Sequence, residues 1–157
     1  MNVEKIFLDY VGGIFATSIY AKDPKFNDYP VQVFKGKNAP LKLNSNTSNF
    51  KTRFRALANS KPNYAGHYVV DFFGCGGGCI SGMAYNVKTG ATQFLPFDTL
   101  SGCYTDDGYI DQSIDYQVNS KLFIAYGSDG SADGKCLVKY YVEQNGQLKL
   151  IKSKKWY

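Results

Sequence analysis

The sequence predicts an α+β domain dominated by β structure, with an antiparallel meander of seven or eight strands and one helix packed on the sheet. Aromatic residues are frequent, including 13 tyrosines and 11 phenylalanines in 157 residues, and these side chains favour strands. After residue 64 the chain consists of short alternating segments separated by glycine, asparagine and aspartate turns. Only one segment carries apolar residues at helical spacing.

The length fits one domain, which we place at residues 29–157 after an N-terminal segment at residues 1–28. A weakly polar run at residues 10–21 ends in alanine, as a signal peptide does before its cleavage site. Glu4 and Asp9 oppose this interpretation because they remove the usual positive charge. Both interpretations of this segment stay open. No stretch reaches the roughly 20 apolar residues of a membrane span, so we expect none.

The elements expected before residue 64 are a strand at 31–34, a short continuation of it at 41–43, and a helix at 46–59. Phe50, Phe54 and Leu57 recur at the spacing of one helical face. Thr47 or Ser48 can cap the first turn with a side-chain oxygen.

A hairpin is expected at the centre of the chain, with strands at residues 64–73 and 80–87. Its turn is rich in glycine, which adopts positive φ angles without steric cost; these glycines are Gly74, Gly76, Gly77 and Gly78. Cys75 and Cys79 should face each other at the neck of this turn.

Five further strands are expected at residues 91–94, 114–118, 122–126, 136–143 and 147–152. Lys88-Thr89-Gly90 and Asn145-Gly146 are typical hairpin connections. Residues 98–113 and 127–135 are polar and are interpreted as long surface loops, which often carry binding residues.

The four cysteines permit three pairings. We expect Cys75 to pair with Cys79, because opposite residues of a hairpin have Cβ atoms about 4.5 to 5.5 Å apart. Cys103 and Cys136 each lie at the edge of a long polar loop, and a bond between them would tie the loops together. Four buried thiols in a cytoplasmic protein are the alternative.

We find no catalytic set and no metal site in the sequence, and expect no cofactor. His67 is the only histidine. On one strand, Asp71 would lie roughly 13 Å from it, which is too far for a catalytic pair. A zinc site needs four ligands at suitable spacing, whereas His67, Cys103 and Cys136 are scattered along the chain.

The formal charge of +5, from 18 basic and 13 acidic residues, does not select a class of partner. No nucleic-acid motif is present, so we expect no nucleic-acid partner. Tyrosines anchor many protein interfaces, and long loops can supply recognition surfaces. The candidate partner-binding residues are Tyr64, His67, Tyr68, Tyr104, Asp106, Asp107, Asp129 and Asp133.

The central motif resembles a group of small, mostly uncharacterised proteins of Gram-negative bacteria. The residues that carry the resemblance are Tyr64, Ala65, Gly66, His67, Tyr68, Gly74, Cys75, Gly76, Cys79, Lys88, Thr89, Gly90, Leu95 and Pro96, with Tyr29, Pro30, Val31, Gln32, Val33, Lys35, Gly36 and the helix that contains Arg53 upstream. Many members of this group carry signal peptides. The resemblance implies the periplasm or cell envelope and no known catalysis; the cytoplasm is the alternative if residues 1–21 belong to the fold.

The leading hypothesis is a non-enzymatic protein that binds another protein, either as a toxin-immunity protein or as an inhibitor of a toxin or hydrolase. Such a protein would be a monomer or form a heterodimer with its partner. The alternative is an envelope domain that binds a glycan or small ligand through tyrosines near His67.

Overall fold

The protein is described here by a computed structural model covering residues 22–97, 99–130 and 134–157. These residues form mostly antiparallel strands and one α-helix, which confirms the predicted α+β class. The helical elements are η1 (Phe26–Asp28), η2 (Ser48–Phe50) and α1 (Lys51–Ala58). The strands are β1 (Tyr68–Gly76), β2 (Cys79–Asn86), β3 (Thr92–Phe94), β4 (Leu100–Ser101), β5 (Cys103–Thr105), β6 (Gly108–Ile110), β7 (Ser113–Tyr116), β8 (Leu122–Gly127), β9 (Leu137–Gln144) and β10 (Gln147–Lys155).

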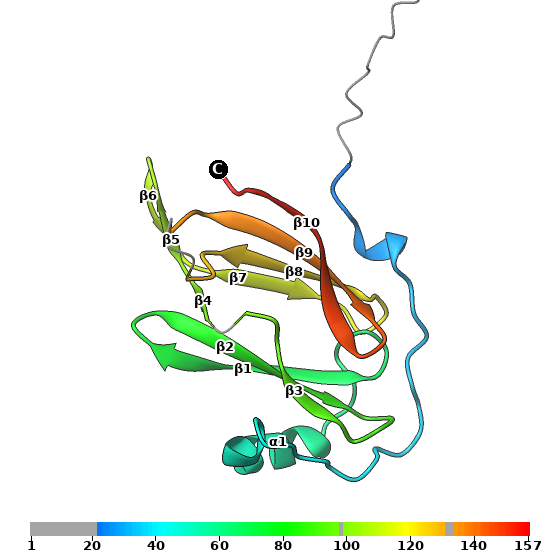
Figure 1. The fold of residues 1–157 in the computed structure, drawn as a ribbon. Helices are drawn as coiled ribbons and strands as arrows, with labels where there is room; N and C mark the ends of the chain where they lie inside the picture. The colour runs from blue at the N-terminus through cyan, green and yellow to red at the C-terminus, as the bar shows by residue number, and fades with distance from the viewer. Residues whose placement is uncertain (1–21, 98, 131–133) are drawn as a thin grey trace, which may run out of the picture.

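The molecule has three layers, with α1 below a first sheet and a second sheet above it (Figure 1). The first sheet has the order β1-β2-β3, and β4 pairs with β2; the second has the order β10-β9-β8-β7. One apolar cluster lies between the two sheets and contains Phe97, Phe123 and Tyr141. Another contains Phe54 of α1 with Met83 and other residues of β1 and β2. The first sheet is therefore covered on both faces.

Strand β8 is buried on both sides. Successive side chains of a strand face opposite sides, and accordingly Phe123 belongs to the cluster between the sheets, whereas Leu122 and Ile124 belong to a third cluster. Phe26 and Trp156 pack against that third cluster. Residues upstream of position 29 therefore contribute to the packing of the second sheet.

The helix is shorter than the predicted 46–59, because its first turn is a 3-10 turn at residues 48–50. Thr47 does not cap it: its hydroxyl accepts a hydrogen bond from the Asn44 amide at 2.9 Å and lies 2.8 Å from the Thr92 hydroxyl. Thr47 is 1 % exposed. This side chain joins the loop before the helix to β3 rather than satisfying the helix terminus.

The central hairpin forms as predicted but begins later, at Tyr68 instead of residue 64. Ala65 and Gly66 have φ angles of 46° and 73°, which interrupt an extended strand. From Tyr68 opposite Asn86 the register runs to Gly74 opposite Ile80. A tight turn therefore replaces the first four predicted strand residues.

Three other predictions for single elements were wrong. The short strand expected at 41–43 is reduced to an isolated bridge between Lys42 and Ala91. Residues 31–34 do not form a strand, because within the described part of the chain their backbone bonds only to the loop at Asn119 and to the turn at Gly66. Residues 98–113 are not one long loop, because β4, β5 and β6 lie within them. These short strands bring the number in the described part of the chain to ten, rather than seven or eight.

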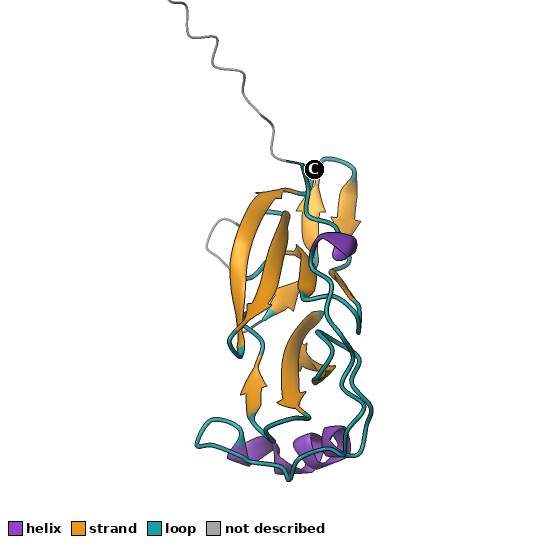
Figure 2. Ribbon diagram, turned by 90° about the vertical axis from the view of Figure 1, so that its right-hand side faces the viewer, coloured by secondary structure: helices purple, strands orange, loops and turns teal. Residues whose placement is uncertain are grey.

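The remaining turns follow the prediction. Gly90 has a φ of 82° between β2 and β3, and Asn145 and Gly146 have φ angles of 51° and 83° between β9 and β10. Side-on, the loop from η1 to η2 runs along the edge of both sheets towards α1 (Figure 2).

Candidate functional site

Two polar segments distant in the sequence are fastened together at one end of the molecule. Ser101 and Ser128 exchange two backbone hydrogen bonds, each of 2.8 Å. Just beyond them, Cys103 and Cys136 form a disulfide with Cα atoms 5.5 Å apart, and both cysteines are buried. The expected pairing is therefore present, and it joins the two predicted recognition loops at a common base.

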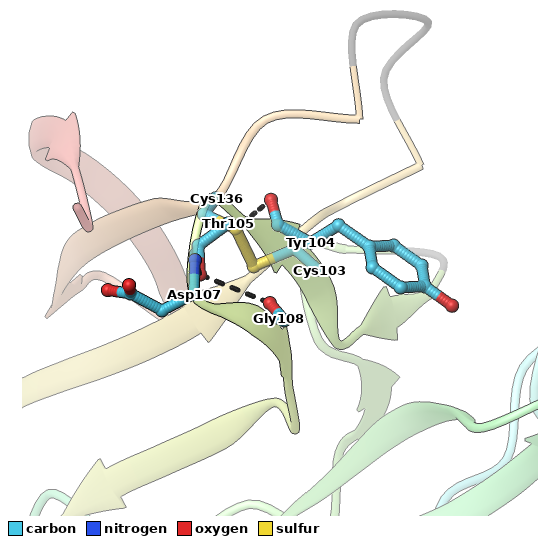
Figure 3. Close-up of a disulfide and its surroundings, with 6 residues drawn as sticks. All are labelled: Cys103, Tyr104, Thr105, Asp107, Gly108 and Cys136. Atoms are coloured by element: carbon cyan, nitrogen blue, oxygen red, sulfur yellow. Dashed lines mark hydrogen bonds between the residues drawn. A yellow bond between two sulfur atoms is a disulfide. The ribbon is translucent and has the colours of Figure 1, made fainter.

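Strands β5 and β6 form a short hairpin on this base, which we call the disulfide hairpin (residues 103–110). Tyr104 lies opposite Tyr109, with ring centroids 5.1 Å apart in an edge-to-face arrangement. The Tyr104 side chain extends away from the disulfide into solvent (Figure 3) and is 80 % exposed, whereas Tyr109 is 49 % exposed. The hairpin thus displays a pair of aromatic side chains that the core does not use.

The tip of the disulfide hairpin is held by its own side chains. The Thr105 hydroxyl donates to the Gly108 carbonyl at 3.1 Å and accepts from the Asp107 amide at 3.3 Å. Threonine hydroxyls stabilise tight turns in this way by hydrogen bonding to the nearby backbone. The exposed carboxylates of Asp106 and Asp107 are therefore presented by an ordered turn.

A cavity of about 380 Å³ lies beside the hairpin. The hairpin contributes Tyr104 and Asp106 to its walls, and the end of the chain contributes Lys155 and Tyr157. Each side therefore supplies one aromatic and one charged side chain. Tyr157 is 60 % exposed. This surface combines flat aromatic area with groups of both charges.

The glycine turn lies next to the disulfide hairpin. Cys75 and Cys79 form the other expected disulfide, with Cα atoms 5.4 Å apart. A Cβ atom placed on Gly78 would lie 3.6 Å from the Tyr109 hydroxyl. The two disulfide-braced turns therefore form one continuous surface.

Of the residues predicted to bind a partner, Tyr64 and Tyr68 are in the core, at 2 % and 3 % exposure, and offer no surface. The Tyr64 hydroxyl donates to the Lys121 carbonyl at 2.7 Å. Burial is the main cause of a raised pKa at both hydroxyls, and the negative charge of Glu143 adds to it. The pKa of Tyr64 is raised, and that of Tyr68 is raised to about 12. Both side chains are neutral packing groups, which removes them from the predicted interface and from a glycan site near His67.

His67 is partly buried, and its Nδ1 atom has no hydrogen-bond partner within the described residues. Its ring packs on Tyr68 with centroids 4.5 Å apart. Burial lowers the pKa of His67 below its ordinary value of 6.5, and the nearby Lys88 and Lys121 act in the same direction against Glu143. The structure favours neutral imidazole at this position.

We expect this histidine to make the fold less stable in mild acid. A group whose pKa is lower in the folded state binds its proton more readily when unfolded, so stability falls as the pH drops below about 6.5. In His67→Gln, the loss of unfolding free energy between about pH 7.5 and about pH 5 should be smaller than in the wild type. Urea unfolding at the two pH values measures this, and an identical loss in both proteins would contradict it.

The predicted acidic residues divide into two groups. Asp106 and Asp107 lie at the tip of the disulfide hairpin, close to Tyr104. Asp129 instead forms an ion pair with Lys139 of β9 and is only partly exposed. Asp133 lies outside the described residues.

Tyr109 and Tyr157 were not predicted as site residues. A signal for Tyr109 existed, since Thr105-Asp106-Asp107-Gly108 has the residues of a tight turn and places the flanking Tyr104 and Tyr109 opposite each other. For Tyr157 there was none, because its position beside the hairpin depends on how β10 ends.

Within the described parts of the chain, no three histidine, cysteine or acidic side chains are grouped so as to hold a metal ion. No helix among these residues has the length and hydropathy needed to cross a membrane. Comparisons with protein-family models, with curated proteins and with solved structures find no match for this chain.

Proposed function

We propose that the protein binds another protein without catalysing a reaction, as a bacterial immunity protein or an inhibitor of a toxin or hydrolase. The observation that carries the proposal is the disulfide hairpin with Tyr104 80 % exposed. Exposed aromatic residues on rigid supports are typical centres of protein interfaces, because they bury a large area and lose little side-chain entropy. The partner would offer a pocket for this ring.

The rigidity of the hairpin supports the same proposal. A loop that is ordered before binding loses less entropy on association than a flexible one. Here the Ser101–Ser128 hydrogen bonds and the Cys103–Cys136 bond hold the base, and the Thr105 hydroxyl holds the tip. Inhibitors that insert a loop into a partner depend on such preorganisation.

The charge at the tip suggests the chemistry of the partner surface. Asp106 and Asp107 are adjacent and exposed, so a basic rim around an apolar pocket would complement them. The two disulfides are typical of proteins in oxidising compartments. Together with the resemblance to envelope proteins, they support a location in the periplasm or cell envelope.

The test is capture of partners by the full chain from extracts of its native host, followed by measurement of the affinity for a captured toxin or hydrolase. Tyr104→Ala should weaken binding by about 30-fold or more, which corresponds to roughly 2 kcal/mol at an interface centre. Thermal stability should be unchanged because the ring is outside the core.

Lys51→Ala serves as the matched control, since this exposed residue lies on α1, away from the hairpin, and should leave binding unchanged. Protection of cells against the captured toxin should follow the affinities. Full protection by Tyr104→Ala, or capture of no stoichiometric protein, would refute the proposal.

A further inference from the structure

A second surface, distant from the disulfide hairpin, lies along residues 32–37, which we call the open edge. Residues 31–34 have the alternation of a strand, yet they pair with no strand among the described residues. They are nevertheless fixed in place. The Val31 amide donates to the Asn119 carbonyl at 3.0 Å, and the Phe34 amide donates to the Gly66 carbonyl at 2.7 Å.

The backbone beside these anchors is unpaired. The N–H groups of Val33 and Lys35 have no hydrogen-bond partner within the described residues, and both residues are exposed. In an extended chain, neighbouring amides alternate between the two edges, so the Val33 and Lys35 amides point away from the Phe34 amide that is bound to Gly66. They lie on the same edge as the Val31 amide, and beyond the contact of Val31 with Asn119 this edge is left unpaired among the described residues. An unpaired edge of this kind can accept an additional strand.

The open edge is surrounded by positive charge. Residues 29–70 contain no aspartate or glutamate. Lys35 and Lys37 lie on the edge itself, and Lys61 lines a cavity against it. The Lys88 ammonium lies 5.8 Å from the centre of the Phe34 ring. A ligand at this edge would therefore meet several ammonium groups.

Cavities border the same residues. One of about 460 Å³ is lined by Val33, Phe34, Lys61 and Pro62. Another, of about 750 Å³, borders Phe34, Lys35 and Lys88. Apolar walls beside ammonium groups suit a ligand in which apolar and acidic side chains alternate.

We propose that the open edge binds an extended acidic segment of a partner protein by strand addition. Backbone hydrogen bonds to Val33 and Lys35 provide the attachment, an apolar side chain enters the cavity at Phe34, and carboxylates pair with Lys35, Lys61 and Lys88. A second copy of this chain is a poor occupant because two lysine-bearing edges repel each other. The proposal does not depend on the function of the disulfide hairpin.

The probe for the test is a fluorescent synthetic peptide of about eight residues that alternates glutamate with valine and phenylalanine, a pattern suited to strand addition. A peptide with lysine in place of glutamate tests charge. A peptide N-methylated at every amide tests strand pairing, because it removes the backbone donors of both strand edges without changing the charge. Anisotropy with the full-length protein measures affinity, and hydrogen exchange reports on the Val33 and Lys35 amides.

We expect the acidic peptide to bind and to protect the Val33 and Lys35 amides, and the other two peptides to bind at least about tenfold more weakly. Lys35→Glu combined with Lys61→Glu should weaken binding to a similar extent. Lys149→Glu, on exposed β10, should leave it unchanged. Unfolding midpoints of the variants establish that each remains folded.

Three results would overturn the proposal. The first is equal binding of the acidic and lysine peptides, or no binding of either. The second is full binding of the N-methylated peptide, which would indicate charge attraction without strand pairing. The third is protection of the Val33 and Lys35 amides in the free protein, which would show that the edge is already occupied by the chain itself or by another copy.

Discussion

Removing the disulfide between Cys103 and Cys136 by a double alanine substitution should lower the free energy of unfolding by about 3 to 4 kcal/mol. The bond spans 33 residues, so its loss opens a long loop and raises the conformational entropy of the unfolded chain. Both sulfur atoms are buried, so the native state also loses packing. Urea unfolding of the oxidised wild type and of the variant measures the difference.

The matched control is the Cys75→Ala and Cys79→Ala variant. Its bond spans only 4 residues in an exposed turn, and the same loop argument gives about 2 kcal/mol. Equal losses in the two variants, or a larger loss at the glycine turn, would show that loop closure does not determine their contributions. Mass spectrometry under non-reducing conditions verifies that the remaining bond is intact in each variant.

The two disulfide variants should also differ in function. If the disulfide hairpin is the recognition surface, loss of the Cys103–Cys136 bond should increase hydrogen exchange at Tyr104 and Tyr109 and weaken partner binding. Loss of the Cys75–Cys79 bond should affect these residues less, because the Ser101–Ser128 hydrogen bonds and the other disulfide still hold the hairpin base. The stability and binding measurements therefore both test whether the Cys103–Cys136 bond holds the disulfide hairpin in place.

The features that could be predicted from the sequence were those determined by local chemistry. Gly90, Asn145 and Gly146 adopt the positive φ angles that their hairpin turns require. Pairing of Cys75 with Cys79 followed from the glycine turn between them, and Cys103 with Cys136 from their positions beside the two polar loops. Alternating apolar residues marked β8 and β9 within one or two residues of their observed bounds.

The features that were missed depend on contacts between distant residues. Residues 31–34 have the composition of a strand, but their neighbours are the turn at Gly66 and the loop at Asn119, which provide single anchors rather than a ladder. Strands of two or three residues, such as β4 and β5, carry too few residues for a periodic pattern. Composition alone therefore predicted a strand where none forms and a loop where three do.

The candidate site was predicted only in part, because the exposure of a tyrosine also depends on contacts between distant residues. Tyrosine has an apolar ring and a polar hydroxyl, so it is found both in cores and at surfaces. Tyr64 can be buried because its hydroxyl donates a hydrogen bond to the Lys121 carbonyl. Tyr104 is exposed because its hairpin projects from the two large sheets (Figure 1). Neither outcome is visible in the residue type or in its immediate neighbours.

Gly66→Ala should be the most damaging single substitution at a glycine next to the open edge. Gly66 has a φ of 73°, and an added Cβ would collide with the Gln32 carbonyl oxygen. Its amide also donates to the Val118 carbonyl at 2.6 Å, and its carbonyl accepts from the Phe34 amide at 2.7 Å. The turn cannot relax without releasing residues 32–34. Left-handed strain and steric overlap together should cost roughly 2 to 5 kcal/mol of unfolding free energy.

Gly77→Ala isolates the contribution of the backbone angle. Gly77 has a φ of 58°, and nothing lies within 4 Å of an added Cβ, so only left-handed strain of roughly 1 to 2 kcal/mol is expected. Urea unfolding gives both losses, and hydrogen exchange at the Phe34 amide should rise in Gly66→Ala alone. Equal losses, with the Phe34 amide still protected in both variants, would mean that Gly66 does not hold the open edge against the body of the protein. In that case the rigid strand-addition surface would lack its principal support.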